Sequence, residues 1–218
     1  MDFDFSVIWQ SLPELLKGAR LTILIATLGL AGGLVIGVIV GSLRAYGVSW
    51  SRKLCLFYIE LVRGTPLIVQ VMFIYFALPL IANIRVDPLV AAVAAIIFNA
   101  GAYIAEIVRG AFISISKSLT EAGHALGLPF WKVLVYIIGP LAFRRMVPAL
   151  GNQFIIGLKD TSLFIVIGVG ELTRQGQEIM AVNFRAVEIW TTVAVIYLLM
   201  IEILTIGLRV LENKMVKV

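Results

Sequence analysis

The sequence places charged residues inside apolar segments, where they need a specific role to be retained. A glutamate precedes an arginine by three residues twice, as Glu60 and Arg63 in "YIELVRG" and as Glu106 and Arg109 in "YIAEIVRG". Residues three apart on a helix are neighbours, so each couple can form an ion pair. The pattern predicts a brace that ties two apolar helices together.

The first of these couples also adjoins a potential helix break. Arg63 is followed by Gly64, Thr65 and Pro66, and a proline removes one intrahelical hydrogen bond and leaves carbonyl groups free. Within a membrane such a break is tolerated where a cavity or a protein partner satisfies the free groups. Arg63 and Thr65 could therefore line a pathway for a solute, so both interpretations of Arg63 stay open.

A second charged pair, Lys159 and Asp160, is followed directly by Thr161 and Ser162. Ionisable residues within a membrane are functional candidates by default. Two opposite charges could bind a zwitterion, or they could form an internal salt bridge that shapes the helix. We place all four residues in the predicted pathway.

Uncharged polar side chains accompany these charges. Amides occur in apolar segments at Gln70, Asn99, Asn152 and Gln153. Each could bind a solute, although such groups more often join two membrane helices. We add Gln70 and Asn99 to the predicted pathway and assign no role to Glu202, which has no evident partner.

Several kinds of chemistry are excluded. The chain has no G-x-x-x-x-G-K-[ST] loop and so cannot bind ATP in the P-loop manner. One histidine, His124, and one cysteine, Cys55, provide no metal site, no catalytic set and no intrachain disulfide. The net charge of +5 comes from scattered lysines and arginines rather than from a nucleic-acid-binding motif. We expect a protein that is not an enzyme and binds neither a cofactor nor a nucleic acid.

The composition indicates that these residues lie within a membrane. Hydrophobic residues make up 61% of the 218 and charged residues 14%, whereas soluble domains average about 45–50% and about 25%. A membrane-crossing helix needs about 20 mostly apolar residues. The sequence predicts an all-α polytopic membrane protein with a single domain, 1–218, and five spans, at about 20–43, 54–81, 89–109, 146–167 and 187–208.

Two details define these spans further. Gly29, Gly33 and Gly37 recur at intervals of four on one face of the first span, where small residues allow close helix–helix approach. The fourth span is placed after Arg144 and Arg145, because two adjacent arginines at mid-membrane would cost at least several kcal/mol.

The distribution of lysine and arginine predicts the orientation of the spans. The connections on one side hold Arg44, Arg52, Lys53, Arg109, Lys117, Lys132, Arg144, Arg145, Arg209, Lys214 and Lys217, and those on the other hold Lys17, Arg20, Arg85, Arg174 and Arg185. The richer side is predicted to be cytoplasmic, with the N-terminus outside and the C-terminus inside. The outer loop 171–188 carries mixed charge and is either solvated or a landing site for a partner.

The cytoplasmic loop between the third and fourth spans contains a separate short helix at about 119–126. Ser118 and Glu121 fit a capping box, and Gly127 suits the left-handed position beyond the helix end. Leu119, Ala122 and Leu126 share one face, which Ala122 and Gly123 leave nearly bare of side chains. So short a helix is marginal alone, so it docks either under its own bundle or on a partner.

A family resemblance favours docking of this helix on a partner. "EAGHALG" followed by "IIGP" resembles the EAA loop in the membrane subunits of bacterial ATP-binding-cassette importers. The matching residues are Glu121, Ala122, Gly127, Ile137 and Pro140, while Gly123 and Gly139 depart from the pattern. The resemblance implies that the segment is a coupling helix that inserts into an ATPase subunit through Leu119, Glu121, Ala122, Gly123, Leu126 and Gly127.

Most of the remaining chain, including "IELVRGTPLIVQVMFIYFALP" and "GNQFIIGLKDTSLFIVIGVGELTRQGQEI", resembles the polar amino acid permeases of these importers. The resemblance implies a multi-pass protein of the bacterial inner membrane that pairs with itself or with a sister permease. Two ATPase subunits, which use ATP and Mg, and an outer substrate-binding protein are the implied partners. An amino acid, with glutamine favoured, is the implied substrate, moved by alternating access. A passive channel or a membrane scaffold without an ATPase is the alternative.

Overall fold

The computed structural model describes residues 3–216, which form helices and turns and contain no strand. The helices are α1 (Phe5–Tyr46), α2 (Ser49–Arg63), α3 (Leu67–Met72), η1 (Phe73–Ala77), α4 (Leu78–Ala82), α5 (Pro88–Ile113), α6 (Lys117–Ala125), α7 (Phe130–Val133), η2 (Leu134–Ile138), α8 (Gly139–Asp160), η3 (Thr161–Ile167), α9 (Leu172–Asn183) and α10 (Ala186–Val216).

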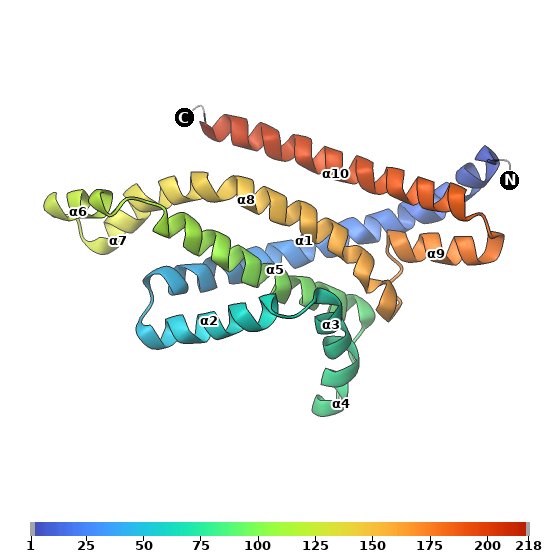
Figure 1. The fold of residues 1–218 in the computed structure, drawn as a ribbon, viewed down its shortest axis with the longest axis horizontal. Helices are drawn as coiled ribbons and strands as arrows, with labels where there is room; N and C mark the ends of the chain where they lie inside the picture. The colour runs from blue at the N-terminus through green and yellow to red at the C-terminus, as the bar shows by residue number, and fades with distance from the viewer. Residues whose placement is uncertain (1–2, 217–218) are drawn as a thin grey trace.

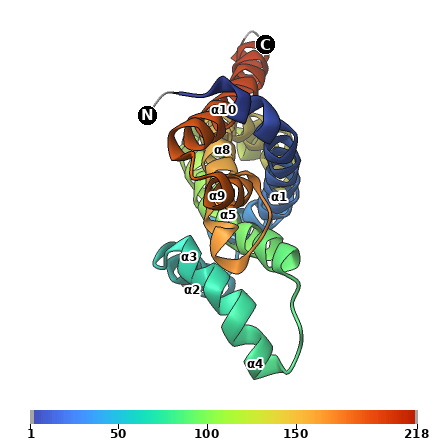
Figure 2. The same cartoon turned by 90° about the vertical axis from the view of Figure 1, so that its right-hand side faces the viewer.

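The long helices run side by side, and the short helices α6, α7 and α9 lie at the two ends of the bundle (Figure 1). Helices α1, α5, α8 and α10 follow the long axis, with α6 and α7 at one end and α9 with the N-terminus at the other (Figure 1). Viewed along the axis, α9 lies over the end of the bundle, while the segment from α3 to α4 extends away from it (Figure 2).

The predicted all-α membrane fold is confirmed. In the described residues, four helical segments are long and apolar enough to cross a membrane, namely Phe5–Tyr46, Pro88–Ile113, Phe130–Ile167 and Ala186–Lys214. A fifth span is formed if Ser49–Arg63 and Leu67–Ala82 are counted together, and these two are bent by 100°. The second span, predicted at 54–81, is therefore broken, at the Gly64–Pro66 segment where the sequence contains a potential helix break.

The helix that contains the fourth span begins earlier than the span predicted at 146–167. It runs from Phe130 to Ile167 and passes Pro140 directly after the π-helical turn η2. The arginines do not interrupt it, because Arg145 is exposed and donates hydrogen bonds to the Ser114 carbonyl (2.6 Å) and hydroxyl (2.9 Å) at the end of α5. Because Arg145 has hydrogen-bonding partners at the end of a neighbouring helix, it can lie within a helix and need not lie in a loop exposed to water.

Glycines bring α1 and α5 into close contact, as the sequence predicted. A Cβ atom at Gly29 would lie 2.5 Å from Ile96 Cγ2, and one at Gly33 would lie 2.9 Å from Ala100 Cβ. The same contact continues to Gly41, where a Cβ would lie 2.5 Å from the Ala105 carbonyl oxygen. Alanines and isoleucines of α5 fill this seam, so the central contact of the fold is made by the backbone of α1.

Gly29→Ala tests this seam. The added methyl group would overlap Ile96, which is 2% exposed, so we expect a loss of about 1–3 kcal/mol in stability. The measurement is thermal unfolding of the purified chain in detergent. The matched control is Gly207→Ala on α10, where a Cβ meets nothing within 4 Å; it should be neutral or stabilising by up to about 1 kcal/mol. Equal effects of the two substitutions would contradict the proposed role of the seam.

Candidate functional site

A polar cavity of about 600 Å³ lies where α2 breaks, between the α2–α3 junction, α5 and the end of α8. This volume falls within the range of about 300–1,000 Å³ that is typical of small-molecule sites. Its polar lining consists of Arg63, Thr65, Asn99, Tyr103, Gln153 and Asp160. Residues from three separate parts of the chain thus bring one cation, one anion and several hydrogen-bonding groups to one space.

At the helix break that forms one wall of the cavity, side chains donate hydrogen bonds to the free backbone carbonyls. Pro66 caps α3, and the chain turns by 100° between Arg63 and Leu67. The Gln70 amide nitrogen donates to the carbonyls of Val62 (2.7 Å) and Thr65 (3.0 Å). The Thr65 hydroxyl donates to the Leu61 carbonyl (3.0 Å). Because an unpaired backbone carbonyl at membrane depth costs several kcal/mol, Gln70 and Thr65 together make this break tolerable.

A second amide ties the break to the centre of the fold. Asn99 on α5 donates to the Gln70 side-chain oxygen (3.1 Å) and is only 7% exposed. Gln70 therefore uses both ends of its amide, one across the break and one toward α5. The predicted pathway residues Gln70 and Asn99 act first as a structural pair, and of the two only Asn99 lines the cavity.

The Arg63 side chain faces the cavity and does not pair with Glu60. Its guanidinium lies 5.2 Å from the ring centroid of Tyr103 on α5, and no Glu60–Arg63 ion pair is recorded among the residues that the structure describes. The second predicted couple is present, because Arg109 Nη2 lies 2.7 Å from Glu106 Oε2. Helices α2 and α5 are joined instead by the Arg63–Tyr103 contact and by a hydrogen bond from the Tyr58 hydroxyl to the Phe98 carbonyl (2.6 Å). The predicted Glu60–Arg63 brace is therefore not formed.

The two residues of the second charged pair, Lys159 and Asp160, have different surroundings. Asp160 lines the cavity, whereas Lys159 is exposed and does not. Neighbouring residues on a helix point in different directions, and no ion pair joins the two in the described chain. The hydroxyls of Thr161 and Ser162 donate to the carbonyls of Leu158 and Lys159, both at 2.8 Å, and lie outside the cavity lining. Arg63, not Lys159, is the cation that shares a cavity with Asp160.

Two lining residues, Tyr103 and Gln153, are absent from the pathway predicted from sequence. Tyr103 lies one helical turn after Asn99, and Gln153 lies two turns before Asp160. Residues three, four or seven apart share one helix face. This spacing predicts Tyr103 and Gln153 as pathway residues once Asn99 and Asp160 are assigned to the pathway.

Beyond the C-terminal end of α5, the short helix predicted at 119–126 exists as a separate element, α6 (Lys117–Ala125). It begins two residues earlier than predicted, because Ser116 is the cap and accepts a hydrogen bond from the Ser118 amide (3.3 Å). The predicted Ser118–Glu121 capping box is therefore wrong. Gly127 has φ +75°, the left-handed conformation that the sequence predicted.

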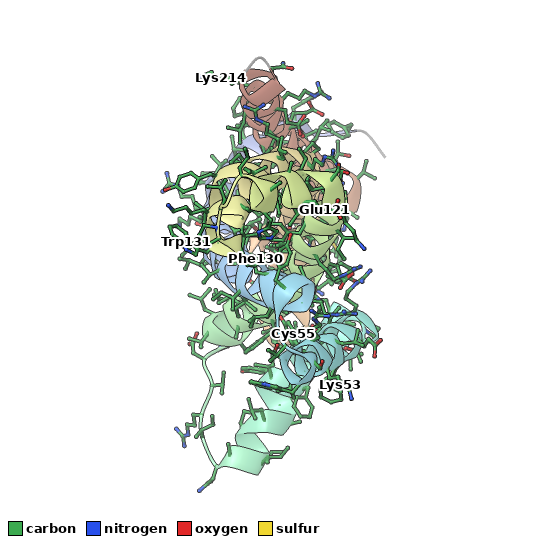
Figure 3. The ribbon with its side chains drawn as sticks, turned by 90° about the vertical axis from the view of Figure 1, so that its left-hand side faces the viewer. Lys53, Cys55, Glu121, Phe130, Trp131 and Lys214 are labelled. Atoms are coloured by element: carbon green, nitrogen blue, oxygen red, sulfur yellow. The ribbon has the colours of Figure 1, made fainter. Side chains whose placement is uncertain are left out.

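The two small residues of α6 face different surroundings. Gly123 is buried against its own chain, and a Cβ there would lie 2.7 Å from Val133 Cγ2. Ala122 and Glu121 are exposed, as is Leu126 at 80%. Gly123 thus serves to seat α6 on α7, and the predicted bare outward face is reduced to Ala122. Figure 3 looks at this end of the bundle, where Glu121, Phe130 and Trp131 lie.

The described residues contain no group of three or more histidine, cysteine, aspartate or glutamate side chains placed to hold a metal ion. The site instead consists of a cavity at a helix break within a bundle of membrane-crossing helices. Irregular backbone at membrane depth is found where it lines a cavity or is buried in protein. The fold and the site define a helical membrane transport component.

Comparisons with known proteins specify the family. Residues 33–217 match the binding-protein-dependent transport system inner membrane component family. The chain is 59% identical to the glutamine transport system permease protein GlnP of Escherichia coli K12 over 99% of both proteins, and 31% identical to the arginine transport system permease protein ArtQ of Bacillus subtilis over 99% of this chain and 98% of that one. The chain belongs to this family of transport-system inner membrane components.

Two solved transporter structures have folds similar to that of this chain. The crystal structure of an amino acid ABC transporter with histidines matches with a TM-score of 0.91 and 30% identity, over 98% of this chain and 100% of that one. The MetNI methionine ABC transporter shares the fold, with a TM-score of 0.82 at 19% identity, over 98% of this chain and 99% of that one. This chain is therefore a multi-pass inner membrane subunit of an ATP-binding-cassette amino acid importer, in which partner ATPases use ATP.

Gln70→Leu tests the break. The substitution leaves the Val62 and Thr65 carbonyls without their donor, so we expect a loss of about 1–3 kcal/mol in stability. The isosteric Gln70→Glu should be no better, because a carboxylate has no N–H to donate. Thermal unfolding in detergent is the measurement, with Asn152→Leu, which removes an exposed amide, as control. Wild-type stability of both Gln70 variants would contradict this account.

Proposed function

We propose that the polar cavity is the site through which this importer subunit carries a polar amino acid, and that glutamine is the substrate. The observation that carries the proposal is that Arg63 and Asp160 line one cavity of about 600 Å³ from different helices. An amino acid is a zwitterion, so its carboxylate can bind the Arg63 guanidinium while its ammonium group binds Asp160.

The neutral lining groups suit a polar side chain. Asn99 and Gln153 are nearly buried amides, at 7% and 6% exposed, and can both donate to and accept from a side-chain amide. The Tyr103 ring holds the Arg63 guanidinium in place from one face. Glutamine is favoured because the glutamine permease relative is 59% identical, against 31% for the arginine permease.

The coupling assignment rests on the surface of α6. Leu119 and Leu126 are 39% and 80% exposed, and Glu121 is exposed between them. An isolated helix of nine residues is marginal, and the contact of Gly123 with Val133 holds only one of its faces. We assign the outward face, with Ala122 and the left-handed Gly127 at its end, to an ATPase partner that hydrolyses ATP with Mg and drives alternating access.

The orientation of the chain follows from where the basic residues lie. The end that carries α6 also carries the α1–α2 connection, and α10 runs back toward it (Figure 1). Arg52, Lys53, Lys117 and Lys132 lie in this part of the chain, which supports a cytoplasmic position for it. We therefore place the C-terminus inside and the N-terminus outside, with α9 on the face that a substrate-binding protein approaches.

The α3–α4 segment supports pairing of two permease chains. It extends from the bundle with Leu80 and Ile81 exposed at 85% and 74%. Such apolar side chains face either lipid or a neighbouring helix within the membrane. We propose a second copy of this chain, rather than a sister permease, as the partner, because one chain already places both charges that the substrate needs in one cavity.

Asp160→Asn tests the substrate site. Losing one charge-assisted hydrogen bond should weaken glutamine binding by about 10- to 100-fold. The measurement is equilibrium binding of labelled glutamine to the purified permease–ATPase complex without the binding protein, which would otherwise dominate the apparent affinity. Lys159→Gln, a neighbouring exposed residue, should leave affinity unchanged. Unchanged binding by Asp160→Asn, or a loss with Lys159→Gln alone, would refute the site.

Glu121→Lys tests coupling. Reversing this exposed charge should leave the chain inserted but lower ATP-dependent uptake at least about tenfold, because like charges across an interface cost several kcal/mol. The control is Glu14→Lys, which reverses an exposed charge far from α6 along the chain. Uptake into vesicles and ATP hydrolysis are measured together. Wild-type coupled uptake would contradict the docking assignment, and uptake without any ATPase would favour a passive channel.

A further inference from the structure

An apolar groove between three membrane-crossing helices plays no part in the roles described so far. It has a volume of about 510 Å³ and is lined by residues of α1, α8 and α10. Its floor consists of buried side chains, Ala26, Leu30 and Leu158, whereas Ile23 and Ile203 on its rim are 47% and 72% exposed. The groove therefore opens away from the bundle, toward the membrane.

The groove exists because α1 carries short side chains where α10 passes it. At its start α10 packs closely on α1, where Leu15 belongs to the same buried cluster as Ile189. Farther along, Ala26, Thr27 and Ala31 of α1 line the groove, and these short side chains leave the space between the helices unfilled. Atoms that line an empty hollow lose dispersion contacts, so an apolar occupant from the membrane would stabilise this region.

The groove has the length of one leaflet of a bilayer. Its lining on α1 runs from Ile23 to Leu34, which is roughly 16 Å at 1.5 Å per residue. The hydrocarbon core of a bilayer is about 30 Å thick, so the acyl chains of one leaflet extend over about 15 Å. In the orientation proposed above, Ile23 lies near the outer end of its span, which places the groove in the outer leaflet.

An arginine without a partner lies at the outer end of the groove. Arg20 is exposed and precedes Ile23 and Thr27 by three and seven residues, so the three share one helix face. Among the residues that the structure describes, no hydrogen bond or ion pair involves the Arg20 side chain, and the nearby Lys17 is bound to Glu14 (2.6 Å). A phospholipid carries its phosphate at this end of its acyl chains, and a guanidinium group binds phosphate well.

A helix of a second copy fits the groove less well than a lipid does. The glycines that allow close helix approach, Gly29, Gly33 and Gly41, are already covered by α5. A docked helix would also bury the unpaired charge of Arg20, which is costly. Moreover, the α3–α4 segment, which we assign to the contact between copies, lies on the side of the bundle opposite to α10 (Figure 1 and Figure 2).

We propose that this groove binds one acyl chain of an anionic phospholipid of the outer leaflet, whose phosphate is held by Arg20. The lipid fills the hollow between α1, α8 and α10 and neutralises a charge that the chain itself leaves unpaired. The proposal goes beyond the proposed function, because it involves neither the polar cavity nor α6. Only the choice of leaflet depends on the proposed orientation.

Arg20→Gln tests the contact with the headgroup. Dioleoylphosphatidylglycerol or dioleoylphosphatidylcholine is added to the purified permease–ATPase complex in detergent, and bound lipid is counted by native mass spectrometry. The wild-type complex should bind the anionic lipid more tightly. The variant should lose about fivefold in affinity for it, the contribution of one basic residue near an anionic surface, and with it the preference. Arg85→Gln, which removes another exposed arginine, should change neither affinity.

Ala31→Phe tests the groove itself. The larger side chain occupies the space of several methylene groups, so the affinity for both lipids should fall at least about tenfold. The control is Val195→Phe, which enlarges an exposed side chain of α10 outside the groove and should leave lipid binding unchanged. Thermal unfolding of each variant shows that it is folded, and added phosphatidylglycerol should stabilise the wild-type protein more than Ala31→Phe.

Three results would overturn the proposal. If Arg20→Gln and Ala31→Phe both bind the lipids as the wild-type complex does, the groove holds no lipid. If Ala31→Phe separates two copies of the chain in the same spectra and leaves lipid binding unchanged, the occupant is a helix of the second copy. If only Ala31→Phe weakens binding, Arg20 does not bind the headgroup. None of these results bears on the polar cavity, which Asp160→Asn tests separately.

Discussion

The structure depends on one constraint, which is that a polypeptide may leave helical geometry within a membrane only where its free backbone groups find partners. The turn of 100° at Gly64–Pro66 would otherwise leave carbonyls unpaired. Gln70 supplies the partners, and Asn99 fixes Gln70 in turn. The Thr65 hydroxyl also takes part, because it donates to the Leu61 carbonyl (3.0 Å) and accepts from Gln70 (3.0 Å). Because the break is stabilised from within, Arg63 can face the cavity.

The sequence predicts those features that depend on local spacing. The glycine seam follows from a fixed interval on one helix face, and the break follows from Gly64 and Pro66, since both are properties of one segment. The direction of Asp160 relative to Lys159 was also available from helical geometry, although the pair was first taken as a unit. The size of the bend was not available, because it depends on how α3 packs on η3 and α5.

Features that depend on distant contacts were missed for a physical reason. Both Ser116 and Ser118 can cap a helix, and the choice is set by Ile115, which is 7% exposed and anchors the preceding turn in the core. Glu171 lies in a polar segment that a sequence reader takes as solvated. Its side chain is nonetheless 0% exposed, and its neighbours come from distant parts of the sequence: the Tyr197 hydroxyl donates to it (3.0 Å), and the Thr22 hydroxyl accepts from the adjacent Leu172 amide (3.1 Å).

The proposed coupling end and the cavity are joined by a single rod. Gly123 seats α6 on Val133, and from Phe130 the helical segment continues for 38 residues through α7, η2, α8 and η3 to Ile167. Asp160 lies near the far end of this rod, and Arg145 fastens its middle to the end of α5. In the proposed mechanism a displacement of α6 is passed along this helix to Asp160, while the other walls of the cavity belong to α5 and the α2–α3 break. The opposite charges of the cavity lie on different helices, Arg63 at the end of α2 and Asp160 at the end of α8, so their separation is set by how these helices pack. We propose that a change in this packing releases the zwitterion, which is what alternating access requires.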